Sequence, residues 1–169
     1  HDALPISHFI DEHGLRSGNH RLRFSPDGKQ LYTGQTVRGW GAPAEGLQRI
    51  TWVGGTPADI ETMKITKKGF IVNFTKEMPD ELADKAAWKF SSFTLQPRWQ
   101  YGSEPENQRG HDIASIKKTG PKTIEVELAD FSAEKIYRLD LQNIKYAEGK
   151  KRTEIQNNLF FYTANELPQ

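Results

Sequence analysis

The chain contains no cysteine, which excludes disulfides, thiolate nucleophiles, cysteine zinc sites and the C-x-x-C-H attachment of a c-type haem. Long apolar runs are also lacking, because no stretch approaches the ~20 apolar residues that a membrane-spanning helix requires. Charge of one sign is scarce as well: 23 basic residues face 22 acidic ones, for a formal net charge of +1. The sequence therefore predicts no membrane span and offers no bulk electrostatic basis for binding nucleic acid.

Common catalytic motifs are missing too. There is no nucleophile elbow, P-loop or dinucleotide fingerprint, since the Gly-Trp-Gly at 39–41 lacks a third glycine and a following helix. The histidines near the start of the chain match no metal-ligand spacing. His111 and Asp112 could form an acid–base pair, but neighbours on a strand point to opposite faces. We therefore expect that pair at the surface, and we predict no catalytic residues and no metal site.

A β-hairpin is indicated near the beginning of the chain. Residues 22–34 read LRFSPDGKQLYTG, in which a Pro-Asp-Gly-Lys turn separates two short β-like runs. Glycine supplies the positive φ that such a turn needs. The phrase F-S-P-D-G-K-x-L-Y is typical of β-propeller blades, and a propeller needs several blades to bury its sheet faces. Because one such hairpin is present, we expect residues 8–45 to be the last blade hairpin and linker of a larger propeller.

Residues 46–169 are predicted to form an all-β, immunoglobulin-like antiparallel sandwich. Three runs, at 70–75, 123–128 and 136–144, alternate strictly between their two faces, and turn signals separate them. The sequence PDELADKAA at 79–87 suits a short helix between strands. We expect one face of each run to be buried, with the following residues inside: Phe70, Val72, Phe74, Ile124, Val126, Leu128, Tyr137, Leu139 and Leu141.

The first seven residues are set aside from this fold prediction. Residues 1–7, HDALPIS, match the translation of a common short-read sequencing adapter. Segments of that kind are excluded from fold reasoning in the same way as fusion scars. We therefore expect the chain to be a metagenomic fragment whose parent gene was cut at the edge of an assembled read.

Three stretches carry a family resemblance: LYTGQTVRGWG at 31–41, GLQRITW at 46–52 and FYTANELP at 161–168. Together they resemble the C-terminal region of exported bacterial proteins with a sorbosone/glucose-dehydrogenase-like, quinoprotein-type β-propeller, often joined to a cytochrome c domain. Residues 60–146 also resemble bacterial immunoglobulin-like modules. The resemblance implies a periplasmic or extracellular location, with the remainder of the parent propeller chain as a partner.

The same resemblance bears on cofactors. It implies that the parent is a quinoprotein-type sugar dehydrogenase using PQQ or haem c, whereas this fragment carries no cofactor of its own. In such propellers, arginines near the last blade neutralise the carboxylates of the cofactor, a contact that suits the guanidinium fork. By resemblance Arg38 is the candidate cofactor-binding residue. Packing of the Arg38–Trp40 loop against the sandwich is the alternative role.

A candidate ligand-binding set lies just after the tryptophan at position 88. Trp99 and Tyr101 alternate there with Arg98 and Gln100. An aromatic face with a flanking amide or guanidinium group is suited to stacking on a sugar ring. In the alternative interpretation Trp88 is core, and Trp99 and Tyr101 line one face of a strand.

These observations favour a non-catalytic accessory or structural module from the C-terminal end of an exported, propeller-type dehydrogenase-like protein. The alternative is a carbohydrate-binding module that holds a polysaccharide on its aromatic residues. A third interpretation is a fragment of the sugar-dehydrogenase site itself, acting through Arg38. An enzyme acting on its own is the interpretation that the sequence favours least.

Overall fold

The computed structural model describes residues 6, 14–36, 45–99, 102–141, 145–148, 151–155 and 157–169. The regular elements are almost all strands, and they form antiparallel sheets. The chain divides into two units: Phe9–Gly55 is one, and His1–His8 together with Thr56–Gln169 is the other. In the first unit the strands are β1 (Gly18–Phe24), β2 (Gln30–Thr36) and β3 (Gly46–Thr51).

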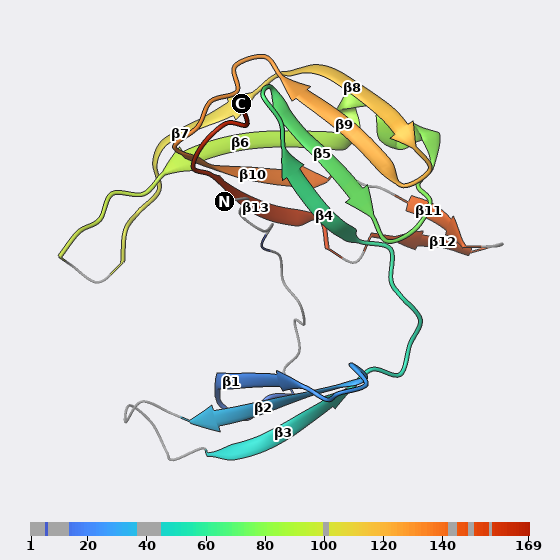
Figure 1. The fold of residues 1–169 in the computed structure, drawn as a ribbon, viewed down its shortest axis with the longest axis vertical. Coiled ribbons are helices and arrows are strands. Elements are labelled where there is room, and N and C mark those ends of the chain that lie inside the picture. The colour runs from blue at the N-terminus through green and yellow to red at the C-terminus, as the bar shows by residue number, and fades with distance from the viewer. Residues whose placement is uncertain are drawn as a thin grey trace. The chain divides into compact units, whose positions relative to one another are not determined.

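The predicted hairpin is present as β1 and β2. Its turn contains Gly28 at φ 70°, and the Asp27 carboxylate accepts hydrogen bonds from the Ser25 hydroxyl (2.5 Å) and the Lys29 amide (3.2 Å). Strand β3 pairs with β2 along its whole length, so the three strands form one sheet in the order β1-β2-β3 (Figure 1). The structure thus divides the chain between residues 55 and 56, later than the boundary at 45/46 that the sequence predicts.

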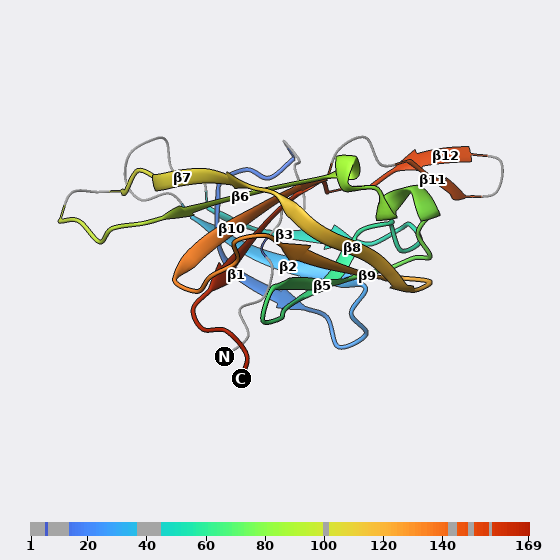
Figure 2. The same ribbon diagram turned by 90° about the horizontal axis from the view of Figure 1, so that it is seen from above.

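The second unit is built from two four-stranded antiparallel sheets and a two-stranded ribbon (Figure 1, Figure 2). One sheet has the order β13-β10-β6-β7 and the other the order β4-β5-β9-β8, while β11 pairs with β12. The strands of this unit are β4 (Ile60–Ile65), β5 (Gly69–Phe74), β6 (Trp88–Thr94), β7 (Glu106–His111), β8 (Ile113–Gly120), β9 (Thr123–Leu128), β10 (Lys135–Leu141), β11 (Lys145–Glu148), β12 (Lys151–Glu154) and β13 (Leu159–Ala164).

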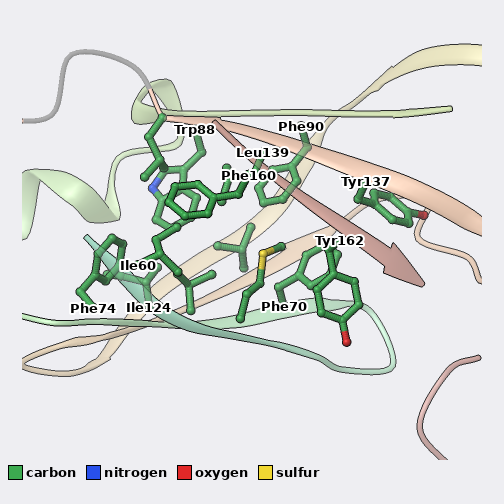
Figure 3. Packing of buried hydrophobic residues seen from close by; sticks show 14 of the residues in the cluster. Ile60, Phe70, Phe74, Trp88, Phe90, Ile124, Tyr137, Leu139, Phe160 and Tyr162 are labelled. Atoms are coloured by element: carbon green, nitrogen blue, oxygen red, sulfur yellow. The ribbon is translucent and has the colours of Figure 1, made fainter. Parts of the chain in front are cut away.

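An aromatic core holds the two four-stranded sheets together. Phe70 of β5 lies 5.8 Å from the ring of Phe90 on β6 and 5.6 Å from that of Tyr137 on β10, so the contacts run from one sheet to the other. Figure 3 shows these side chains pointing toward one another from the two sheets. The expected interior is confirmed, because all nine residues predicted to be inside are buried: Phe70, Val72, Phe74, Ile124, Val126, Leu128, Tyr137, Leu139 and Leu141. The fold is therefore all-β and sandwich-like.

Two local features differ from the sequence prediction. The expected short helix at 79–87 consists of two 3-10 turns, η1 (Asp80–Ala83) and η2 (Lys85–Ala87), with the Asp84 side chain accepting a hydrogen bond from the Ala86 amide between them. Strand β7 was not predicted from the sequence. It is an edge strand of mostly exposed polar residues, and Asp112 alone separates it from β8 in the other sheet.

Strand β13 receives one further partner from the beginning of the chain. Ile6 and Phe161 exchange two backbone hydrogen bonds of 2.9 Å, which form an isolated antiparallel bridge at the edge of the β13 sheet. Ile6 lies within residues 1–7, which the sequence interpretation sets aside as artefact. No helix in the described part of the chain is long and apolar enough to cross a membrane.

Candidate functional site

The loop between β6 and β7 carries the most exposed aromatic side chain among the described residues. Trp99 is 92% exposed, and Leu95 at the start of the loop is 46% exposed. The loop extends beyond the sheets in both views (Figure 1, Figure 2). A large apolar ring that is almost wholly in water contributes nothing to the core, so this position is available for contact with a ligand or partner.

Polar contacts hold the base of this loop. Arg98 forms an ion pair with Glu106 at the start of β7. The Ser103 hydroxyl donates to the Gln96 carbonyl (2.7 Å), and the Asn107 amide donates to the Thr94 hydroxyl (3.0 Å). The two ends of the loop are therefore tied together, so that Trp99 is presented from a closed stem.

The structure describes two of the four residues of the predicted ligand-binding set. Trp99 and Arg98 lie on the loop as described, with Arg98 engaged by Glu106. Gln100 and Tyr101 lie outside the described residues, and so does Arg38, the candidate cofactor-binding residue. Trp88 belongs to the core, as one interpretation required, and its indole nitrogen donates to the Leu82 carbonyl (2.6 Å).

A second constellation was not foreseen from the sequence. His111 was expected at the surface, but it is buried, and its side chain is 0% exposed. Its Nδ1 lies 2.6 Å from an Asp130 carboxylate oxygen, and its Nε2 lies 2.7 Å from the Ser92 hydroxyl. Asp130 also pairs with Arg109 of β7. His111 is buried because its side chain, at the end of β7, faces the interior where the chain passes from one sheet to the other.

The partners of His111 define the tautomer of its neutral ring. A carboxylate can only accept, so in the neutral ring Nδ1 carries the proton and donates to Asp130, while Nε2 accepts from the Ser92 hydroxyl. Burial lowers the pKa of His111, and the positive charges of Arg109 and Lys135 act in the same direction, against a smaller opposing effect of Asp112. Above the ordinary histidine pKa of 6.5 the imidazole is therefore neutral in the fold.

This order of hydroxyl, imidazole and carboxylate matches that of a serine-hydrolase triad. Its environment differs, because Ser92 is 1% exposed and a substrate carbonyl has no access to its hydroxyl in this structure. The three groups instead link the β6–β7 side of one sheet to the segment that follows β9 in the other sheet. The arrangement acts as a buried polar cross-link between the two sheets.

No local sequence signal could have revealed this cross-link. Ser92 and His111 are 19 positions apart, and so are His111 and Asp130. Within the described part of the chain, no group of three or more His, Asp or Glu side chains is arranged to hold a metal ion. Comparison with protein-family models, with curated proteins and with solved structures gives no significant match.

Proposed function

We propose that this chain is a non-catalytic accessory module of an exported, propeller-type dehydrogenase-like protein. In this proposal residues Thr56–Gln169 are an immunoglobulin-like sandwich and the β1-β2-β3 sheet is a remnant propeller blade. The observation that supports the non-catalytic role is the burial of Ser92: the hydroxyl of its triad-like arrangement with His111 and Asp130 lies inside the sandwich. Catalysis by such a triad requires a hydroxyl that a substrate can reach.

A fluorophosphonate probe tests the non-catalytic role directly, because it labels only serines that are both activated and accessible. We expect no labelling of the full chain in its native state. Stoichiometric labelling of Ser92, abolished in the S92A variant, would contradict the proposal and make the chain a hydrolase. An S91A variant is the matched control, because Ser91 is the neighbouring serine on the same strand.

A second candidate function is favoured by the exposure of Trp99. A ring that is 92% exposed on a tied loop suits stacking against the apolar face of a neutral sugar. In this candidate the module binds a plant or algal polysaccharide of the parent's surroundings. Tyr101, Gln100 and Arg98 complete the proposed platform, as in the sequence prediction.

Affinity electrophoresis in gels that contain neutral polysaccharides tests the second candidate. We expect the full chain to be retarded by at least one of them, and the W99A variant to lose about 1–3 kcal/mol of binding free energy, the scale of an interface hot spot. W52A is the matched control, because Trp52 is also exposed (48%) but lies in the other unit. Equal retardation of W99A and W52A would rule out a platform centred on Trp99.

A further inference from the structure

The β1-β2-β3 sheet presents a face on which arginines surround one tyrosine. Arg23 of β1, Tyr32 of β2 and Arg49 of β3 lie directly opposite one another in register. Residues paired across neighbouring strands project from the same face of a sheet, and so do residues two apart on one strand. Arg21, which pairs with Gly34, therefore joins the same face.

The positive charges of the arginines on this face are accessible to a ligand. Arg21, Arg23 and Arg49 are all exposed. Among the residues that the structure describes, none of the three has a side-chain ion pair or hydrogen bond. Three like charges that have no acidic partner within the described ranges repel one another, and an anion bound between them relieves that repulsion.

The tyrosine between them is held in a defined position. Tyr32 is half-buried, and its hydroxyl donates to the Gln30 amide oxygen (2.6 Å), two residues back on the same strand and face. Its neighbour on that face, Gly34, has no side chain, so the sheet surface beside the ring stays shallow. A flat ligand can therefore approach the ring with charged groups on either side.

The spacing of the strands sets the scale of that ligand. Neighbouring strands are ~4.8 Å apart, so the backbones of Arg23 and Arg49 lie about 10 Å apart on either side of Tyr32. A guanidinium fork binds carboxylate or sulfate groups in a bidentate manner, and an aromatic ring stacks on the apolar face of a sugar. The row formed by Arg23, Tyr32 and Arg49 thus fits a sugar ring over Tyr32, with one anionic group at Arg23 and another at Arg49.

We propose that this face of the β1-β2-β3 sheet binds an acidic polysaccharide. Two other polyanions fit less well. Single-stranded nucleic acid is held by successive aromatic rings and a strongly positive groove, whereas here one ring is flanked by three arginines and the whole chain has a net charge of only +1. An acidic peptide strand pairs with the edge of a sheet, whereas these side chains project from its face. The residues of this site belong to the unit Phe9–Gly55, whereas the Trp99 loop belongs to the other unit.

Affinity electrophoresis of the full chain in gels containing polygalacturonate tests the proposal. We expect retardation that weakens as salt is raised, because screening acts on exposed charges. Methyl-esterified polygalacturonate has the same sugars without the negative charge and should retard the chain far less. Equal retardation by both polymers would show that charge does not determine binding and would overturn the proposal.

Variants locate the site. The R23Q/R49Q double variant should bind polygalacturonate about tenfold or more weakly, since it loses two charge-assisted contacts. K29Q is the matched control, because Lys29 lies in the hairpin turn outside this face, and it should bind like the unchanged protein. Both substituted positions of the double variant are exposed, so we expect its circular dichroism spectrum to match that of the unchanged protein. A matching spectrum confirms that the variant still folds.

Two further measurements separate this site from its competitors. W99A should keep its full affinity for polygalacturonate, whatever happens to neutral polysaccharides, because Trp99 lies in the other unit. An oligo-dT strand at the same ionic strength should bind more weakly than polygalacturonate. Tighter binding of oligo-dT, or unchanged polygalacturonate binding by R23Q/R49Q, would overturn the assignment.

Discussion

Replacing His111 with leucine removes the central group of the buried cross-link. The variant H111L deprives Ser92 of its acceptor, because leucine has no polar atom, and since Ser92 is 1% exposed, water does not replace it. Leaving a buried hydroxyl unsatisfied costs about 1–3 kcal/mol of unfolding free energy. The Asp130 side chain is 39% exposed and keeps its partner Arg109, so loss of the second hydrogen bond adds little. We therefore expect a destabilisation of about 1–3 kcal/mol near pH 8.

The same substitution changes how stability depends on pH. Burial lowers the pKa of His111 below its ordinary value of 6.5, so just below pH 6.5 the unfolded chain binds this proton more readily than the folded chain. The contribution of the neutral imidazole is complete above pH 6.5 and is lost as the pH falls through 6.5 toward the folded-state pKa. One proton limits the slope to about 1.4 kcal/mol per pH unit. H111L has no titratable group at this position and lacks this slope.

Urea unfolding followed by circular dichroism, at several values between about pH 8 and about pH 5, measures both effects. The unchanged protein should lose stability relative to H111L as the medium becomes acidic, so the difference in unfolding free energy between them should narrow. H20L is the control: His20 is exposed on β1, and its replacement should leave the unfolding free energy near pH 8 unchanged. A difference between the unchanged protein and H111L that stays constant or widens toward acid would refute the cross-link as described.

Three other substitutions test the packing of the sandwich. F70A should cost about 3–5 kcal/mol of unfolding free energy, since this fully buried ring contacts Phe90, Tyr137 and Tyr162 of the opposite sheet; F161A, at a partly exposed ring, should cost less. G69A should destabilise the chain by about 1–3 kcal/mol, because the added methyl would collide with the Val126 carbonyl oxygen. The methyl of G110A would lie 4.0 Å from the Phe90 carbonyl oxygen, an ordinary van der Waals contact, and should be tolerated. Y137F should lower the unfolding free energy by about 1–3 kcal/mol, because the Tyr137 hydroxyl both donates to the Ser132 carbonyl and accepts from the Ser132 amide (3.0 Å each). A loss below a few tenths of a kcal/mol would contradict a stabilising role for these two hydrogen bonds. Urea unfolding midpoints compare F70A with F161A, G69A with G110A, and Y137F with the unchanged protein.

The candidate sites were accessible to sequence reasoning to different degrees. Trp99 was proposed from the sequence because guanidinium and amide groups flank its ring, a pattern suited to stacking on a sugar, but its exposure was decided only by the structure. The arginine face around Tyr32 was not identified, because its members come from three strands and meet only through their register. Strand β7 was not predicted, because an edge strand exposed to water has no alternation of apolar and polar residues, as its sequence ENQRGH shows.

Alternation along single strands was determined by the sequence itself. Side chains of a strand point in turn to opposite faces, so the period of two in the runs beginning at Phe70, Ile124 and Tyr137 dictated which residues are buried. Pairing between strands is a non-local choice, which the tertiary structure alone decided. It joined β3 to β2 rather than to the sandwich, and it brought His111 between Ser92 and Asp130. Contacts between distant segments depend on how the whole core closes, and no run of neighbouring residues encodes them.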